Sequence, residues 1–430
     1  MSDTVIVPAE APWLEGAAVL ARLRELDHET WFVGGCVRDL LLGRPVHDVD
    51  LATGATPDQV EAAFDKTVAV GKSFGVVVVV TPSGDHVEVA SFRSDGAYID
   101  GRRPTAIHLS TAVADVERRD FTINALLMGP DGVIVDHVGG RRDLSARTIR
   151  GVGNAPARLA EDRLRVLRAL RFAARMDLAI APDTWAAVRS ISLIGLSAER
   201  IIQEWDKALA ELAWDKSMPI SRARFRGRFL RLCAASGRLA EITPPLADAS
   251  PATIAATATA LDRLPINVET DAAMALWLAS ADPAQAARWL AGQPLERARV
   301  RTMTWLLQNL AAWRKPADPW QAMSVAERRR LAMHPDATGL WLALSALDTS
   351  PPAESSARAF GRALDCEWDA GTAQGQWKPL IRGDDLKTFG IAPGPEFGRW
   401  LRRVEDAELE GAFTDRTGGL AWLAEARQAP

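Results

Sequence analysis

The sequence predicts an α+β fold in which a small sheet domain is followed by an all-α body and tail. Short strand-like runs between glycine turns occupy the N-terminal part of the 430 residues. From Arg158 onward, Ala, Leu, Arg and Trp recur with helical spacing to the end. We therefore expect an N-terminal helix in 1–30, a sheet domain over 31–150, a group of helices over 151–240, and a helical body and tail over 241–430.

The sheet domain begins with a helical pattern of apolar residues and continues as alternating strands, turns and short helices. Thr56 is a suitable N-cap for one of these helices, and the five consecutive valines favour a fully buried strand. The expected elements are helices over Trp13–Leu26, Val37–Leu42, Pro57–Phe64 and Phe121–Leu126, strands over Trp31–Val33, Val46–Leu51, Val76–Val80 and Val87–Phe92, and a loop over Ser94–Pro104.

Composition excludes several classes of protein. A hydrophobic content of 48% supports real cores, and a net charge of −4 is unlike that of a globally basic nucleic-acid binder. The three cysteines have neither zinc nor disulfide spacing, which favours buried thiols in a reducing compartment. The N-terminus lacks a signal-peptide pattern, and no apolar run reaches the ~20 residues of a membrane helix. We expect a cytoplasmic protein with no membrane contact, and no feature indicates a protein partner.

A pair of carboxylates follows a glycine turn in the segment FVGGCVRDLLLGRPVHDVDLAT. Side chains two apart in a strand point the same way, so Asp48 and Asp50 are expected side by side, with Val49 on the opposite face. Adjacent carboxylates repel unless a cation lies between them. Oxygen ligands suit Mg²⁺, which bridges carboxylates to substrate phosphates. The alternative is a pair of solvated turn residues after Pro45.

The glycine turn itself suits a phosphate. Gly34 and Gly35 allow close approach of the backbone to a ligand, and Arg38 can hold a phosphate through its guanidinium fork. Together with a metal-binding pair of carboxylates, this pattern is typical of nucleotidyl transfer, in which metal ions stabilise the attacking and leaving oxygens.

The segment resembles the catalytic motif of the class II tRNA nucleotidyltransferase and poly(A) polymerase family, in the polymerase-β-like superfamily. A glycine pair followed by Asp-x-Asp alone is a weak pattern. Here three further motifs follow in the family order: RRDFTINAL at Arg118–Leu126, VDHVGGRRDL at Val135–Leu144 and EDRLRVLRALRFAAR at Glu161–Arg175. The match weakens after about residue 180, which leaves tRNA contacts and oligomeric state unassigned.

The resemblance implies a third catalytic carboxylate and a nucleotide-binding arginine. Glu88 is the candidate carboxylate, on a strand that can pair beside the one with Asp50; a surface glutamate is the alternative. Arg119 is the implied nucleotide contact. We expect Asp120 and Asn124 to hold the turn after it, with Asp120 also capping the helix that follows.

The last motif is expected to choose the base. On one helix, Asp162 and Arg165 are three residues apart and share a face. The resemblance implies that this pair acts as an amino-acid template, since an acceptor and a donor can match the edges of C and A. Arg168 and Arg171 would contact base or phosphate. An amphipathic helix laced with ion pairs is the alternative.

Other basic segments are less specific. The resemblance places the end of a flexible loop at Arg102 and Arg103, with an ordinary hairpin loop as the alternative. Two arginine clusters are candidates for tRNA phosphate contacts, and solvated helix faces explain them equally well. The clusters are Arg222, Arg224, Arg226 and Arg228, and Arg328, Arg329 and Arg330. The tail Leu380–Gly411 resembles that of bacterial family members.

The resemblance implies an enzyme that adds C, C and A to tRNA 3′ ends from CTP and ATP, with Mg²⁺ as cofactor. Bacterial poly(A) polymerase shares the motifs, but Val70–Val80 is more similar to the tRNA enzymes. A-only addition stays open, and the loop ending at Arg102-Arg103-Pro104 argues against CC-only addition. A non-catalytic RNA-binding protein is disfavoured because both Asp48 and Asp50 are present.

Overall fold

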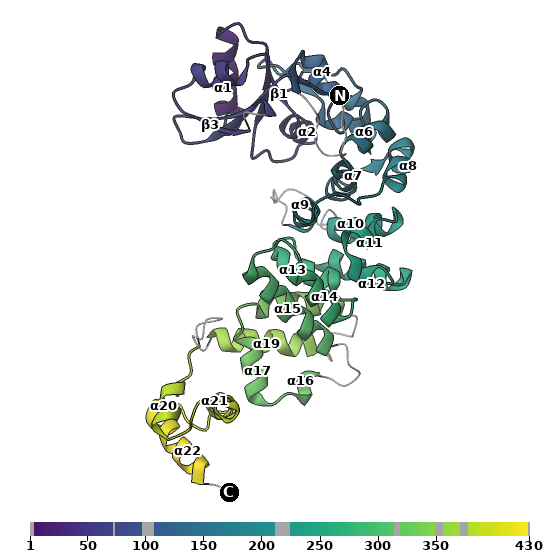
Figure 1. Cartoon of the computed structure of the whole chain (residues 1–430). Coiled ribbons are helices and arrows are strands. Elements are labelled where there is room, and N and C mark those ends of the chain that lie inside the picture. The colour runs from purple at the N-terminus through teal and green to yellow at the C-terminus, as the bar shows by residue number, and fades with distance from the viewer. Residues whose placement is uncertain are drawn as a thin grey trace. The chain divides into compact units, whose positions relative to one another are not determined.

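The computed structural model divides into two compact units, with the boundary between Asp248 and Ala249 (Figure 1). Its described residues are 4–71, 74–96, 107–210, 224–313, 319–348, 356–369 and 377–428. The domain boundaries predicted from the sequence stay predictions. In these ranges no helix combines the length and apolar character that a membrane crossing requires.

A mixed seven-stranded sheet forms the base of the first unit. Its strand order is β3-β4-β5-β2-β1-β8-β9. The strands are β1 (Thr30–Val33), β2 (Asp50–Thr53), β3 (Thr67–Gly71), β4 (Val76–Val80), β5 (His86–Ser91), β8 (Leu127–Met128) and β9 (Ile134–Val135). β2 and β5 pair in parallel with Asp50 opposite Glu88, which confirms the predicted pairing of these strands. This register sets two acidic side chains next to each other at the sheet.

Helices α1 (Trp13–Glu25) and α3 (Pro57–Ala63) pack on the sheet, and both confirm predicted helices. Val49 is buried beside Gly16 of α1, as expected for the residue between the two aspartates. Thr56 caps α3 through a reciprocal capping box with Gln59. α2 (Gly35–Leu41) begins at the second glycine of the turn that follows β1.

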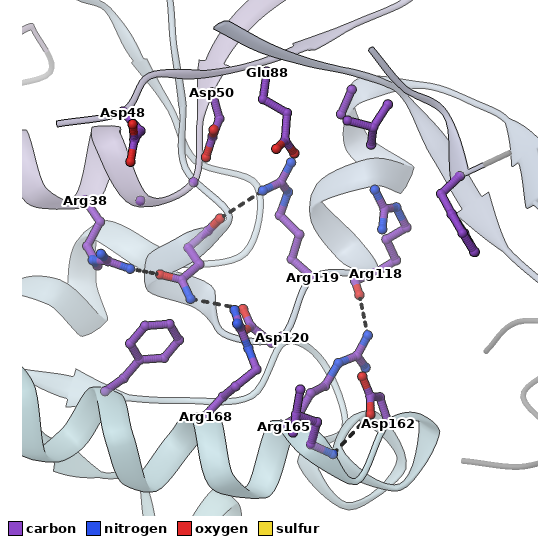
Figure 2. A pocket seen from close by; sticks show the side chains of 18 of the residues that line it. Arg38, Asp48, Asp50, Glu88, Arg118, Arg119, Asp120, Asp162, Arg165 and Arg168 are labelled. Carbon is purple, nitrogen blue, oxygen red and sulfur yellow. Dashed lines mark hydrogen bonds and ion pairs between the residues drawn. The ribbon is translucent and has the colours of Figure 1, made fainter. Parts of the chain in front are cut away.

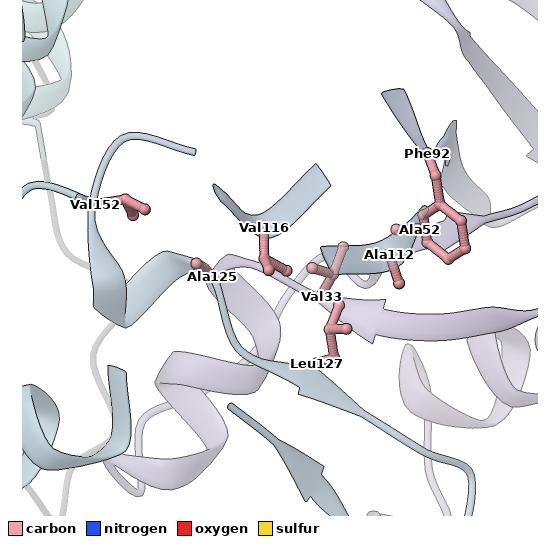
Figure 3. Close-up of a cluster of buried hydrophobic side chains, with 8 residues drawn as sticks. All are labelled: Val33, Ala52, Phe92, Ala112, Val116, Ala125, Leu127 and Val152. Carbon is pink, nitrogen blue, oxygen red and sulfur yellow. The ribbon is translucent and has the colours of Figure 1, made fainter. Parts of the chain in front are cut away.

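A buried cluster joins the sheet to α4 (Ala112–Glu117), as Figure 3 shows. It brings together side chains from β1, β2, β8, α4 and the chain around them. Its members are Val33, Ala52, Phe92, Ala112, Val116, Ala125, Leu127 and Val152. This packing fixes α4 against the sheet, so it also fixes the position from which the residues after Glu117 continue.

Three predicted strands or helices differ from the structure. The strand predicted over Val46–Leu51 begins and ends too early: β2 spans Asp50–Thr53, because β1 ends at Val33 and offers no backbone to pair with earlier residues, so Asp48 lies just before the strand. The helix over Phe121–Leu126 is wrong; the chain forms a 3-10 turn, Thr122–Asn124, and enters β8. The valines of β4 are not fully buried, since every second one lies on the less covered face.

The rest of the first unit is mostly helical. Its elements are α5 (Gly140–Ser145), α6 (Ala155–Glu161), α7 (Leu164–Arg175), α8 (Pro182–Ser190), α9 (Ala198–Leu209), α10 (Phe225–Ala235), α11 (Leu239–Ile242) and the paired strands β10 (Thr148–Ile149) and β11 (Ala179–Ile180). β11 lies in a region where the sequence predicts only helices. It was missed because a strand of two residues is too short to show the alternating pattern of a strand. The predicted loop over Ser94–Pro104 starts inside β6 (Arg93–Asp95), which pairs with β7 (Ile107–Leu109).

The second unit is helical, as predicted. Its helices are α12 (Pro251–Arg263), α13 (Thr270–Leu278), α14 (Pro283–Ala291), α15 (Arg297–Ala312), α16 (Pro319–Ala322), α17 (Val325–Ala332), α18 (Ala337–Leu347), α19 (Ser356–Asp369), α20 (Gly383–Thr388), α21 (Pro395–Leu409) and α22 (Arg416–Gln428). The arginines of α17 bond within this unit: Arg328 to the Trp320 carbonyl, Arg329 to the Leu409 carbonyl and Arg330 to Asp406. They join α17 to its neighbours, so a simple solvated face does not describe them.

The motif VDHVGGRRDL supports the motif RRDFTINAL from behind. Both carboxylate oxygens of Asp136 accept backbone N–H groups at the start of α5, including that of Gly140 at 2.9 Å. A Cβ at Gly140 would lie 2.2 Å from the carbonyl oxygen of Thr122. Asp143 accepts the Thr122 hydroxyl at 2.8 Å. The glycine therefore lets α5 lie against the 3-10 turn.

We predict that Gly140→Ala destabilises the first unit, because the added methyl group collides with backbone that cannot move away. Overpacking of this kind costs about 1–3 kcal/mol. Chemical unfolding followed by circular dichroism measures the change. Gly398→Ala in α21 is the control, since no atom lies within 4 Å of its Cβ position and alanine favours helix. Equal stability of Gly140→Ala and wild type would contradict the packing described.

Candidate active site

Three carboxylates line one side of a cavity of about 870 Å³ in the first unit. Asp50 and Glu88 stand on neighbouring strands and Asp48 precedes β2, and all three point into the same space (Figure 2). Burial, and next the repulsion from Glu88, raise the pKa of Asp50 to about 6, although Arg119 pulls it down. The arginines near Asp50 therefore do not fully offset its burial and its repulsion by the neighbouring carboxylates.

This set of oxygens fits a hard cation. Within the described ranges no three His, Cys, Asp or Glu side chains form a ready-made metal cage. Mg²⁺ does not require one, since it commonly binds through one or two carboxylates and completes its shell with water and substrate phosphates. The unrelieved repulsion at Asp50 is what such an ion would relieve.

The glycine turn lies against these carboxylates. Gly34 has φ 81° and ψ −129°, a backbone conformation that side chains disfavour. A Cβ there would lie 3.4 Å from Nη1 of Arg119 and 3.9 Å from Oδ2 of Asp50. Gly34 and Gly35 both line the cavity. The turn thus leaves open the space where a ligand would meet both charged groups.

A chain of hydrogen bonds crosses the floor of the cavity from Arg38 to Arg168 (Figure 2). Arg38 Nη1 donates to Asn124 Oδ1 at 2.5 Å, and Asn124 Nδ2 donates to Asp120 Oδ1 at 3.0 Å. Arg168 donates to the other oxygen of Asp120 at 2.8 Å. Asp120 also accepts the Phe121 N–H, which confirms that Asp120 and Asn124 hold this turn.

Asp115 of α4 fixes the two arginines that follow it. Its side chain is fully buried and binds Arg118 through one oxygen, at 2.5 Å, and Arg119 through the other, at 2.9 Å. Burial alone would raise the pKa of Asp115, but Arg119 and Arg118 lower it below the ordinary value. The carboxylate is therefore held charged, and Arg119 is held facing the cavity.

Arginines of α2 and α7 lie around one aromatic ring. The guanidinium groups of Arg38, Arg168 and Arg171 lie 5.3, 5.0 and 4.3 Å from the centre of the Phe172 ring. Arg171 donates to the buried Glu204 of α9 at 2.6 Å. These contacts hold the cations in place in spite of their mutual repulsion.

The proposed template pair lies at the far end of the cavity, but not on one helix. α7 starts at Leu164, and Asp162 has extended backbone between α6 and α7. The predicted helical i, i+3 relation is therefore wrong, because the chain must turn between the two helices. Asp162 binds Arg200 and the Leu164 N–H. Arg165 binds Glu161 and the carbonyls of residues 158 and 118.

The cavity collects the predicted residues that the structure describes. Its lining includes Gly34, Gly35, Arg38, Asp48, Asp50, Glu88, Arg119, Asp162, Arg165, Arg168 and Arg171. Nine arginine and lysine side chains face five carboxylates in this lining. The local charge is thus positive although the chain as a whole carries −4, which suits a polyanionic ligand.

Some predicted residues lie elsewhere. Arg102 and Arg103 fall outside the described residues. Arg226 is fully buried and donates to the Leu209 carbonyl at 2.7 Å, so its predicted RNA contact is wrong.

Sequence reasoning missed Asp115 and the α9 residues Arg200, Glu204 and Lys207. The three α9 residues are spaced at i, i+4 and i+7, and this spacing could have predicted that they share one face of a helix.

Comparisons with known proteins show what this chain is similar to. Residues 30–150 match the poly(A) polymerase head domain family. The CCA-adding enzyme of Streptococcus pyogenes is 42% identical over 203 residues, 46% of this chain and 50% of that protein. That of Geobacillus stearothermophilus is 43% identical over 212 residues, 49% of this chain and 52% of that protein. The chain thus matches about half the length of these curated relatives.

Solved structures extend the likeness to nearly the whole chain. The crystal structure of the Bacillus stearothermophilus CCA-adding enzyme in complex with CTP aligns with a TM-score of 0.78 and 29% identity. The alignment covers 97% of this chain and 98% of that one. The Thermotoga maritima CCA-adding enzyme complexed with tRNA covers 100% of both chains, with a TM-score of 0.63 and 18% identity, and shows the shared fold.

We predict that Asp120→Asn lowers the free energy of unfolding near neutral pH, and that this loss disappears in acid. Burial would raise the pKa of Asp120, but Arg168 and the Asn124 hydrogen bond lower it to about 2. Because the folded-state pKa lies below the ordinary value, the stabilisation is complete above about pH 4 and disappears as the pH falls through 2. Its size is roughly 2 kcal/mol.

Urea unfolding of wild type and Asp120→Asn between pH 6 and pH 2 measures this contribution. The variant should be less stable at pH 6, and the difference should shrink toward pH 2. A difference that stays constant over this range would mean that the Asp120 charge does not stabilise the fold.

Proposed function

We propose that this chain is a CCA-adding enzyme of the class II tRNA nucleotidyltransferase and poly(A) polymerase family. It adds CMP, CMP and AMP to tRNA 3′ ends from CTP and ATP and releases pyrophosphate. One arrangement carries this proposal: three acidic side chains face an arginine-lined cavity that also contains the glycine turn and the Asp162–Arg165 pair. Catalytic, phosphate-binding and base-reading groups thus share one site.

The carboxylates serve the metal-dependent step. Asp48 and Asp50 would hold Mg²⁺, and Glu88 stands next to them as the third acidic group. When bound, the ion activates the attacking 3′ hydroxyl and neutralises charge on the leaving pyrophosphate. Burial, and then repulsion from Glu88, raise the pKa of Asp50, and a bound cation would offset both.

The cationic groups bind the triphosphate. The turn at Gly34 and Gly35 allows the phosphates to approach the backbone, while Arg38 and Arg119 offer guanidinium donors from two sides. Asn124 and Asp115 hold these arginines before the nucleotide arrives. A preorganised site of this kind loses little freedom when the substrate binds.

Base choice rests on Asp162 and Arg165. The carboxylate accepts a hydrogen bond from the amino group that C and A carry, and Arg165 donates to a ring acceptor. U and G present a carbonyl where C and A present the amino group, so they leave Asp162 without a donor. Arg168 and Arg171 support the base and phosphates from the same helix.

The substrate range follows from sequence features as well as from the cavity. Bacterial poly(A) polymerase is the nearest alternative, since its family shares the head domain. A-only or CC-only addition would use the same catalytic carboxylates. Arg102 and Arg103, which we assign to a flexible loop that assists A addition, lie outside the described residues. We propose a cytoplasmic location, consistent with a tRNA substrate.

We predict that Asp48→Ala and Asp50→Ala abolish nucleotide transfer and leave tRNA binding largely intact, because they remove metal ligands and not RNA contacts. The loss should be on the order of a thousandfold or more. Incorporation of labelled CTP measures transfer, and a gel-shift assay with tRNA measures binding. Asp58→Asn on α3 is the control, since Asp58 does not line the cavity. Transfer by either alanine variant would refute the assignment of the carboxylates.

We predict ordered addition of C, C and A that then stops, on tRNA ending at the discriminator base, at −C and at −CC. Chelation of divalent ions should stop the reaction and added Mg²⁺ should restore it. Labelled CTP and ATP, with an unstructured RNA beside each tRNA, distinguish the outcomes. A-only addition, or long A tails on any RNA, would keep the site and overturn the tRNA substrate assignment.

A further inference from the structure

Arg200 of α9 contacts the carboxylate that we assign to base reading. Its Nη2 donates to Asp162 Oδ2 at 2.8 Å, and both side chains line the cavity with about a fifth of their surface exposed. The two residues are 38 positions apart in the chain. Only the packing of α9 beside α7 brings them together.

Asp162 depends on such contacts for its orientation. It lies in extended backbone between two helices, with φ −137° and ψ 105°, so its side chain is fixed by contacts that it makes and not by a place inside a helix. The Leu164 N–H holds one carboxylate oxygen at 3.0 Å and Arg200 holds the other. A carboxylate has about four acceptor positions, so acceptors remain for a base amino group after both contacts form.

Arg165, the other half of the template pair, is held by different groups. It donates to Glu161 at 2.6 Å and to the carbonyl of residue 158 at 2.6 Å. Loss of Arg200 would therefore free the acceptor that reads the amino group and leave the donor in place. The amino group distinguishes C from U and A from G.

Arg200 also carries a hydrogen-bonding group that the described residues do not satisfy. Its Nη1 is buried and has no partner among them. Buried polar atoms are normally hydrogen-bonded, and this one belongs to a side chain in the cavity lining. Because this atom has no exposed surface, it is not directly available to a ligand, and Arg200 reaches the nucleotide through Asp162.

We infer that Arg200 is a positioning residue for base selection, which orients the Asp162 carboxylate toward the amino group of C or A. This inference rests on the proposed function of the site. It predicts a loss of selectivity when Arg200 is changed, and not a uniform loss of rate.

Steady-state kcat and KM for CTP and UTP on tRNA ending at the discriminator base, and for ATP and GTP on tRNA ending in CC, test this. In Arg200→Ala the preference for CTP over UTP and for ATP over GTP, as ratios of kcat/KM, should fall about tenfold. Arg200→Lys keeps the charge and should keep part of the preference. A merely structural role would lower all four kcat/KM values together and leave the ratios unchanged, which would overturn the inference.

Arg163→Ala is the matched control. Arg163 is next to Asp162 in sequence, but its guanidinium donates to the Ile194 carbonyl and is absent from the cavity lining. Its ratios should equal those of wild type, and a similar fall would contradict a specific role for Arg200. Thermal unfolding of each variant checks the fold, and if Arg200→Ala does not fold, Arg200→Gln and Arg200→Lys decide by the same ratios.

A double-mutant cycle tests whether Arg200 acts through Asp162. Asp162→Ala should lower the selectivity ratios, and adding Arg200→Ala should lower them no further, since coupled residues are not additive. Additive losses would overturn the inference. A wild-type protein that transfers no nucleotide would overturn the proposed function itself, whereas an A-only enzyme still tests Arg200 through the ATP and GTP ratio.

Discussion

The buried carboxylate of Asp120 is the contact on which the site depends. Through Asn124 it reaches Arg38 at the start of the sheet domain, and directly it binds Arg168 on α7. Its own backbone carbonyl accepts the N–H of Val152, which leads toward α6. Segments far apart in the sequence are thus tied to one group. Because the pKa of Asp120 stays near 2, this link remains charged at any pH at which the protein is expected to work.

Crowded positive charge is the second constraint. Arginines gather within a few ångströms of Phe172 and at the end of α4, where their mutual repulsion would drive them apart. Burial, and then repulsion from Arg171 and its neighbours, lower the pKa of Arg175 to about 9. Three buried carboxylates, each bound to an arginine, offset this repulsion: Asp115, Asp120 and Glu204. The phosphates of the proposed nucleotide substrates would add further negative charge beside the same arginines.

The motifs therefore divide into two kinds. Residues of the first, second and fourth motifs reach the cavity, whereas VDHVGGRRDL lies behind the 3-10 turn and supports it through Asp143 and Gly140. Arg200 and Glu204 form a further layer on α9, holding Asp162 and Arg171. The groups that we propose for base reading thus come from two helices and the turn before α7, and not from one helix face.

The sequence by itself determined the residue types of the site and the order of the elements that carry them. Local spacing was sufficient for the glycine turn, the Thr56 cap and the alternation that puts Glu88 on a strand, because each depends on neighbours within a few residues. The tertiary structure decided what depends on distant contacts. The pairing of Asp50 with Glu88 was a prediction that only the sheet register confirmed. The break before Leu164, the 3-10 turn after Asp120, and the partners Asp115 and Arg200 follow from packing, which overrides local helical spacing wherever the chain must turn to bury its apolar face.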